Sequence, residues 1–351
     1  MLKPTSPNSS GISRLSSPFL SGTNRVTLQM LQLLLALVPA VIGIVYFFGP
    51  SVLITMALAI VVALLAEALM LKLRNRPLKP FLTDGSAIVT AALLAIALPP
   101  LAPWWLVTTG ILFAIIFAKH LYGGLGYNPF NPAMVAYVVL LISFPLEMTT
   151  WLPVTTLSEQ PLNFESTFQM IFTGQVSSGI AIDSLSGATP LDAMKTQIGL
   201  LQNPADIMQQ PLFGLFSGKG WEWINILFII GGLYLLYRRV ISWHIPTAMI
   251  VSLAIISGIT WLVAPETTAS PLFHLLSGGT MLGAFFIATD PITASTTVKG
   301  RLVFGAGVGL LTYIIRVWGG YPDGIAFAVI LMNMLVPLID YYTQPKVYGA
   351  K

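Results

Sequence analysis

Long apolar segments recur throughout this sequence and leave little material for a water-soluble core. A helix needs about 20 mostly apolar residues to cross a bilayer. Ten segments approach that length, at about 26–48, 51–71, 83–99, 104–118, 130–147, 221–237, 244–264, 271–289, 302–317 and 324–340. Only 9% of the residues are charged, whereas soluble domains carry about 25%. The sequence therefore predicts an all-α integral membrane protein with ten transmembrane helices.

The distribution of Lys and Arg predicts the orientation in the membrane. If the N-terminus is cytoplasmic, 14 of the 17 basic residues fall in cytoplasmic segments, the exceptions being Lys195, Lys219 and Arg316. Cytoplasmic loops of membrane proteins are enriched in these residue types. We therefore expect both termini in the cytoplasm, and the one long loop, at 148–220, on the periplasmic side of the inner membrane.

The predicted helices divide into two halves of five on either side of this loop. The expected parts are a cytoplasmic N-terminal segment at 1–25, a first five-helix repeat at 26–147, the periplasmic loop at 148–220, a second five-helix repeat at 221–340 and a cytoplasmic tail at 341–351. Five helices followed by five have opposite topology, so the halves would be inverted repeats, which place a pathway at their interface.

A short pattern supports the repeat. A basic residue, an aromatic residue and Gly-Gly follow one another within 119–124 and again within 316–320. Chance is the alternative explanation, because Gly-Gly is common in membrane helices.

The absence of cysteine restricts the chemistry of the chain. Without cysteine it holds no thiolate-bound iron–sulfur cluster, disulfide or cysteine nucleophile. His120, His244 and His274 are scattered without metal-ligand spacing, so we expect no metal site. The net charge of +4 reflects the orientation in the membrane and does not indicate nucleic-acid binding. A redox role would need an organic cofactor or a metal supplied by a partner.

The long loop contains one motif that suggests chemistry. Thr189 follows three small residues, Ser186, Gly187 and Ala188, and Asp183 lies six residues upstream of it. Nothing near Thr189 in the sequence resembles a general base or a metal site. If the segment has a chemical role, the Thr189 hydroxyl is therefore more consistent with a covalent attachment point than with a catalyst.

A second motif combines glycine, asparagine and proline between two predicted helices, at 122–133. Its glycines allow close approach of a ring, and Asn128 and Asn131 can donate and accept hydrogen bonds. One interpretation is a cofactor site built from irregular backbone in a protein-lined cavity. The other is a tight turn in which Pro132 begins the next helix. The spacing favours neither interpretation.

A third motif, Thr289–Thr293, ends the eighth predicted helix. Thr289, Asp290 and Thr293 offer oxygen atoms that could hold the polar atoms of a cofactor or a cation. A solvated turn near the lipid phosphates is the alternative interpretation, and for direct coordination of an ion it is the one we favour.

Ionisable residues within predicted spans are costly and often functional. Glu67 lies about one turn from Lys72, so we expect it to reach the cytoplasmic interface. Asp84 precedes Gly-Ser and is expected to cap the third helix. Arg316 lies near the outer helix ends, where the long loop should dock, and is a candidate for cofactor binding.

Taken together, these motifs resemble those of one known family. Four segments are similar to motifs of the D subunit of the Rnf ion-translocating electron-transport complexes. They are Thr-Asp-Gly-Ser at 83–86, Gly-Gly-Leu-Gly-Tyr-Asn-Pro-Phe-Asn-Pro-Ala at 123–133, the Ser-Gly-Ala-Thr loop and Phe-Phe-Ile-Ala-Thr-Asp-Pro at 285–291. They are also similar to those of the B subunit of the sodium-pumping NADH:quinone reductase. The Rnf protein is the better match, because its quinone-reductase counterpart has a longer N-terminal extension.

The resemblance implies a cofactor and partners. In this family FMN is joined through its phosphate to a threonine hydroxyl by a flavin transferase, and the matching residue is Thr189, with Asp183 in the recognition pattern of the transferase. A second, non-covalent flavin similar to riboflavin is also implied. The family members are translocase subunits that work with the A, B, C, E and G subunits of the Rnf complex, and the complex couples electron exchange between NADH and ferredoxin to ion movement.

A channel or carrier for a small solute, without a redox cofactor, is the alternative function from a different class. Inverted repeats and broken helices fit that function equally well. Covalently bound flavin distinguishes the two.

Overall fold

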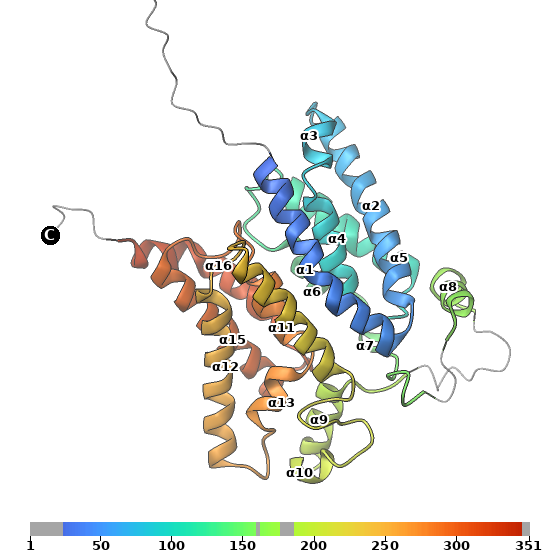
Figure 1. The fold of residues 1–351 in the computed structure, drawn as a ribbon, viewed down its shortest axis with the longest axis vertical. Helices are drawn as coiled ribbons and strands as arrows, with labels where there is room; N and C mark the ends of the chain where they lie inside the picture. Colours follow the sequence, from blue (N-terminus) through green and yellow to red (C-terminus); the bar gives the residue numbers. More distant parts are fainter. Residues whose placement is uncertain (1–23, 159–161, 176–185, 346–351) are drawn as a thin grey trace, which may run out of the picture.

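The computed structural model describes residues 24–158, 162–175 and 186–345. These residues are almost entirely helical, with two isolated β-bridges and no longer strand among them (Figure 1). Asp183 lies outside the described residues, as do 1–23 of the predicted cytoplasmic segment.

The helices follow one another in the order predicted from hydropathy. Before the long loop they are α1 (Asn24–Phe48), α2 (Ser51–Leu73), α3 (Leu78–Leu82), α4 (Ser86–Ala97), α5 (Trp104–Leu112), the π-helix η1 (Phe113–His120), α6 (Pro132–Ser143) and α7 (Pro145–Thr149). The loop contains α8 (Phe164–Thr173), α9 (Pro190–Gly199) and α10 (Pro204–Ile207). After it come α11 (Trp221–Tyr237), α12 (His244–Val263), α13 (Pro271–Leu276), α14 (Thr280–Leu282), the π-helix η3 (Gly283–Ile287), α15 (Val298–Trp318) and α16 (Ile325–Thr343).

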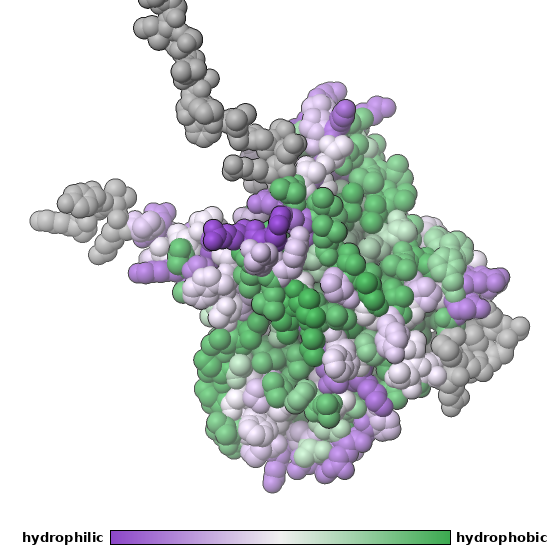
Figure 2. Space-filling model, in the orientation of Figure 1, coloured by the Kyte–Doolittle hydropathy of each residue, from purple (hydrophilic) through white to green (hydrophobic). Residues whose placement is uncertain are grey.

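Among the described residues, six helical segments are long and apolar enough to cross a bilayer: Val26–Phe48, Ser51–Leu73, Leu78–Ala97, His244–Val263, Val298–Trp318 and Ile325–Thr343. Apolar side chains cover the flanks of the molecule, and polar ones gather toward its ends (Figure 2). These features indicate a multi-pass membrane protein, as predicted. The count of ten spans, the repeat layout and the domain boundaries stay predictions.

The two halves of the helical body meet along two helix pairs. Helix α1 packs against α11, and α6 packs against α16. The first contact depends on Gly231, because a Cβ atom there would lie 2.0 Å from the carbonyl oxygen of Ala36. Small residues commonly allow membrane helices to approach this closely.

The eighth predicted span is not one continuous helix. Helix α13 ends at Leu276, and α14 begins at Thr280. Between them Gly278 has a φ of +55°, a left-handed conformation that glycine adopts without a steric penalty. The predicted span at 271–289 therefore consists of two short α-helices followed by a π-helix. Hydropathy did not indicate the interruption, because it reports apolar character and is insensitive to a local backbone break.

The contact between α1 and α11 can be tested with Gly231→Ala. The added methyl group forces the two helices apart, and overpacking of this kind costs about 1–3 kcal/mol. We expect a lower thermal unfolding midpoint for the purified protein in detergent. Gly258→Ala in α12 is the control, because its Cβ would meet only the Pro271 Cγ atom at 3.8 Å. Equal midpoints for the two variants would contradict the close contact.

Candidate functional site

A cavity lies beneath the long loop where the two halves meet. Its empty volume is about 1370 Å³, including its opening to the outside. Phe48, Tyr137, Trp221 and Phe228 contribute aromatic walls. Ligand cavities are usually apolar with a few converging polar groups. We call this space the loop-face cavity, and the end of the molecule that carries residues 144–220 the loop face.

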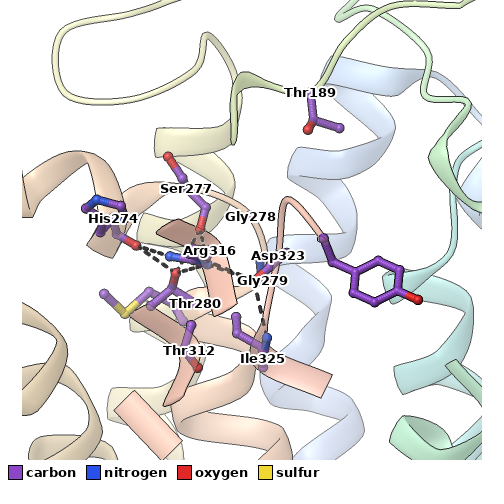
Figure 3. A network of polar contacts seen from close by, with 12 residues as sticks. Thr189, His274, Ser277, Gly278, Gly279, Thr280, Thr312, Arg316, Asp323 and Ile325 are labelled. Carbon is purple, nitrogen blue, oxygen red and sulfur yellow. Dashed lines mark hydrogen bonds and ion pairs between the residues drawn. The ribbon is translucent and has the colours of Figure 1, made fainter. Parts of the chain in front are cut away.

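Thr189 lines the loop-face cavity from above. It is the N-cap residue of α9, where its Oγ1 atom accepts a hydrogen bond from the backbone N–H of Asp192 at 3.2 Å. Pro190 occupies the first helical position, which suits its fixed φ and missing N–H. Thr189 as a residue is only partly buried, and it lines the cavity (Figure 3).

The residues before Thr189 form a short exposed strip. Ser186 and Ala188 are exposed, and Gly187 is half-buried. The backbone N–H of Gly187 donates to the carbonyl oxygen of Trp151 at 2.8 Å. This bridge ties the strip to the beginning of the loop.

Lys195 attaches α9 to the second half of the molecule. Its ammonium group donates to the backbone carbonyls of Gly319 and Tyr321, which connect α15 to α16. Burial lowers the pKa of Lys195, and the neighbouring Asp192 carboxylate opposes part of that lowering. The sequence offered no sign of this contact, because Lys195 lies more than a hundred residues from its partners.

The helix break between α13 and α14 forms part of the floor of the loop-face cavity. Gly278 and Gly279 line the cavity, and Figure 3 shows Thr189 above them. A break of this kind leaves backbone N–H and C=O groups without helical partners. The hydroxyl of Thr280, at the break itself, donates to the carbonyl oxygens of His274 and Ser277. Three buried or partly buried side chains from other parts of the chain supply the remaining contacts.

Arg316 and Asp323 are two of these side chains. The guanidinium of Arg316 donates to the carbonyl oxygens of His274 at 2.6 Å and Ser277 at 3.3 Å. It also forms an ion pair with Asp323 at 3.0 Å. The second carboxylate oxygen of Asp323 accepts from the backbone N–H of Gly279 at 3.0 Å. The ion pair therefore holds both sides of the break (Figure 3).

Asn225 is the third side chain and is fully buried. Its Nδ2 atom donates to the carbonyl oxygens of Leu276 and Gly278, each at 3.0 Å. Its Oδ1 atom accepts from the backbone N–H of Met281 at 3.1 Å. The sequence predictions missed Asn225. A lone asparagine within an apolar helix is the signal that could have identified it.

Asp323, not Arg316, contributes to the wall of the loop-face cavity. Arg316 lies behind Asp323 and is buried. The predicted position of Arg316 near the docked loop agrees with the structure. Its expected contact with a cofactor stays a prediction, and the geometry gives it a positioning role through Asp323.

A second cavity, of about 860 Å³ in empty volume, brings together three motifs that are far apart in the sequence. Ser86, Lys119, Asn128, Asn131, Thr289 and Asp290 all line it. We call it the motif cavity. It lies at the opposite ends of the helices from the loop-face cavity.

The two asparagines of the motif cavity differ in their hydrogen bonding. Asn131 caps α6, because its Oδ1 atom accepts from the backbone N–H groups of Ala133 at 3.1 Å and Met134 at 3.3 Å. The motif therefore includes the tight turn, with Pro132 beginning the helix. Asn128 donates to the carbonyl oxygen of Phe130 at 3.1 Å, and its buried Oδ1 atom has no hydrogen-bond partner within the described part of the chain.

Asp290 caps its own turn. Its carboxylate accepts from the backbone N–H of Ile292 at 3.2 Å and the hydroxyl of Thr293 at 3.1 Å. The hydroxyl of Thr289 donates to the carbonyl oxygen of Phe285 at 2.7 Å. These bonds agree with the interpretation of the motif as a turn. Asp290 also lines the motif cavity.

Glu67 is buried in an ion pair beside the motif cavity. Its carboxylate oxygens accept from the Lys119 ammonium at 2.8 and 2.9 Å, and both side chains are 2% exposed. The expectation that Glu67 reaches the interface was therefore wrong. Lys119 is brought to it by η1, one of two π-helices in the described chain. Such helices occur frequently at functional sites.

The ion pair extends into a short polar chain. Lys119 also donates to the hydroxyl of Ser86 at 2.9 Å. That hydroxyl donates to Asp84 at 2.6 Å, and Asp84 accepts from the backbone N–H of Ser86 at 2.7 Å. Asp84 thus accepts from the first backbone N–H of α4, although the N-cap residue of this helix is Gly85 and not Asp84 as predicted. The Nε2 atom of His120 lies 3.1 Å from Glu67 without hydrogen-bond geometry.

Comparison with known proteins places this membrane protein in a family. Residues 14–349 match the NQR2, RnfD, RnfE family. The chain is 54% identical over 345 residues to the D subunit of the ion-translocating oxidoreductase complex of Yersinia pseudotuberculosis serotype I (strain IP32953), covering 96% of this chain and 98% of that protein.

Two further relatives carry the same name. That of Pectobacterium carotovorum subsp. carotovorum (strain PC1) is 54% identical over 344 residues, and that of Aliivibrio salmonicida (strain LFI1238) is 52% identical over 345. In both cases the match covers 96% of this chain and 98% of the relative. The chain belongs to the NQR2, RnfD, RnfE family, as the motifs indicated.

The buried pair can be tested with Lys119→Met. This variant leaves the Glu67 carboxylate buried without its partner, which costs about 3–5 kcal/mol. We expect a marked fall in the thermal unfolding midpoint and partial recovery in the double variant Glu67→Gln/Lys119→Met. Lys72→Met, on the exposed surface of α2, is the control and should leave the midpoint unchanged. A double variant less stable than Lys119→Met would contradict the pairing.

Proposed function

We propose that this chain is the D subunit of an ion-translocating oxidoreductase complex, a translocase, and that it carries electrons on FMN joined through its phosphate to Thr189. The complex would couple electron transfer between NADH and ferredoxin to ion movement. Family membership and the shared name of the relatives support the assignment to this complex. The position of Thr189 is the single observation that supports the attachment site.

The surroundings of Thr189 suit a phosphate ester. The N-terminus of a helix favours a bound phosphate, because its N–H groups and dipole face the negative charge. Thr189 caps α9 at this point, although the Asp192 carboxylate in the first turn acts against the added charge. The exposed, small Ser186 and Ala188 give a flavin transferase access to the hydroxyl.

The loop-face cavity suits the flavin ring. Tyr137, Trp221 and Phe228 offer apolar and aromatic surface, and Asp323 adds a polar edge. The flavin supplies the redox chemistry when bound, and the protein orients it and excludes water. Arg316 holds Asp323 and the Gly278–Gly279 turn in place, so it sets the shape of the floor.

The motif cavity is our proposed site for the second, non-covalent flavin. The buried Oδ1 atom of Asn128 is an acceptor without a partner among the described residues, and flavins carry ring and ribityl donors. Asn131 shapes the site by capping α6. With one cavity toward each end of the helices, the two flavins would carry electrons across the membrane.

The proposed layout is ten spans in two inverted repeats, with both termini in the cytoplasm and the loop in the periplasm. The pairing of α1 with α11 and of α6 with α16 supports it, because each pair joins corresponding helices of the two halves. Since the chain contains no cysteine, partner proteins must supply any iron–sulfur clusters. Those partners would be the A, B, C, E and G subunits of the Rnf complex.

A channel or carrier remains the second candidate function. The break at Ser277–Gly279 favours it, because discontinuous helices often bind the transported solute. The presence of covalently bound flavin distinguishes the two functions, since transport of a small solute by a carrier needs no redox cofactor.

The attachment site can be tested by in-gel fluorescence. Protein from cells that contain the flavin transferase is denatured, separated by electrophoresis and viewed under ultraviolet light. We expect a fluorescent band for the native chain and none for Thr189→Ala. Ser186→Ala is the control and should keep the band. A dark native band would defeat the redox function, and a fluorescent Thr189→Ala band would move the attachment site elsewhere.

The second flavin can be tested with Asn128→Leu. Loss of the buried acceptor should cost about 1 kcal/mol, roughly a five-fold loss of affinity. We expect less flavin released on denaturation, measured by chromatography of the supernatant. The covalent fluorescence of the same sample is the internal control and should not change. Unchanged release would place the second flavin away from Asn128.

A further inference from the structure

Helix α8 carries a row of three aromatic side chains, of which two are exposed and one is partly buried. Phe164, Phe168 and Phe172 are spaced four residues apart, so they lie along one face of the helix. Phe164 is 60% exposed and Phe168 is 47% exposed. The rings of Phe168 and Phe172 are 4.5 Å apart between centroids. We call these three side chains the Phe row.

The other faces of α8 are either packed or polar. Thr167 and Ile171 are buried, and α8 contacts α2. Glu165, Gln169 and Thr173 are exposed on the side away from that contact. The helix is thus amphipathic: one side packs against the protein, the next carries the Phe row, and the third is polar and exposed.

The ends of α8 are well defined. Asn163 caps its N-terminus by accepting from the backbone N–H of Ser166 at 2.8 Å. Gly174 ends it in the left-handed conformation, with a φ of +69°. The capped ends make α8 a discrete helix within the long loop, so its exposed face is a fixed surface.

Helix α8 lies beside α2, and a residue just before it is close to the turn between α1 and α2. The carbonyl oxygen of Leu162, just before α8, lies 3.9 Å from where a Cβ atom of Gly49 would be, in the turn between α1 and α2. Figure 1 shows α8 nearly end-on, whereas α1 and α2 run across the picture. Helix α8 therefore runs roughly perpendicular to α1 and α2, beside α2.

One flank of α2 is exposed and apolar. Leu53, Ala57, Val61 and Leu65 form an exposed stripe with a spacing of four residues. The stripe begins at the loop-face end of α2, the end beside α8. Green side chains also mark the place of α8 in Figure 2. Helix α8, which carries the Phe row, thus lies beside the end of α2 at which this exposed apolar stripe begins.

We propose that α8 is an interfacial helix whose Phe row inserts into the loop-face leaflet, at the boundary between headgroups and acyl chains. Interfacial helices bury their apolar face about 5–10 Å into this region. Helix α8 has no Lys or Arg, so the partner it fits is the apolar boundary of the bilayer and not an anionic headgroup. This inference is independent of the proposed flavin.

Anchoring of α8 has a consequence for the loop. The segment that follows α8 leads to the Ser186–Thr189 strip, which is held at its other side by the bridge from Gly187 to Trp151. A membrane-bound α8 would keep the first half of the loop at the bilayer surface. The loop would then be attached by lipid at α8 and by protein contacts at α9.

The absence of cysteine makes the proposal directly testable by spin labelling. Phe168→Cys and Gln169→Cys are labelled with a nitroxide in the complete complex, reconstituted in phosphatidylcholine nanodiscs. Electron paramagnetic resonance then compares collisions with oxygen, which concentrates in acyl chains, and with a water-soluble nickel chelate. We expect oxygen to dominate at 168 and the nickel chelate to dominate at 169.

Two results would overturn the proposal. Dominant nickel collisions at both positions would show that the Phe row faces water. A label at 168 that is immobilised and shielded from both reagents would show that another protein of the complex covers α8. Phe164→Cys repeats the measurement on the same face, so a folding defect in one variant does not decide the outcome.

Discussion

In the apolar interior of a bilayer, a backbone N–H or C=O without a partner costs several kcal/mol. This constraint accounts for the most important polar contacts of the molecule. The break between α13 and α14 exposes such groups, and Asn225, Arg316 and Asp323 satisfy them from three other parts of the chain. Without these side chains the helix would have to continue, and the floor of the loop-face cavity would be lost.

The same constraint shapes the motif cavity at the other helix ends. Asn131 satisfies the start of α6, and its own backbone N–H donates to Asn333 of α16 at 3.2 Å. The Glu67–Lys119 pair neutralises two charges that the apolar surroundings would not tolerate singly. Irregular backbone therefore occurs where protein surrounds it, and both cavities are built there.

The candidate cofactor site combines two parts with different origins. Thr189 belongs to a loop, and the cavity that it faces belongs to the helices of both halves. Lys195 and the bridge from Gly187 to Trp151 bring the two together. Thr189 is partly exposed and lines the cavity, which is the arrangement that the proposed attachment requires.

By itself, the sequence determined the membrane character, the helix order and the family, because these depend on local hydropathy and contiguous motifs. Only the tertiary structure decided that Glu67 pairs with Lys119, that Asn225 seals the break after Leu276, and that Lys195 anchors the loop. Those partners are from 51 to 126 residues apart. No periodicity in one segment reports a hydrogen bond to another, since such contacts exist only after the helices have packed.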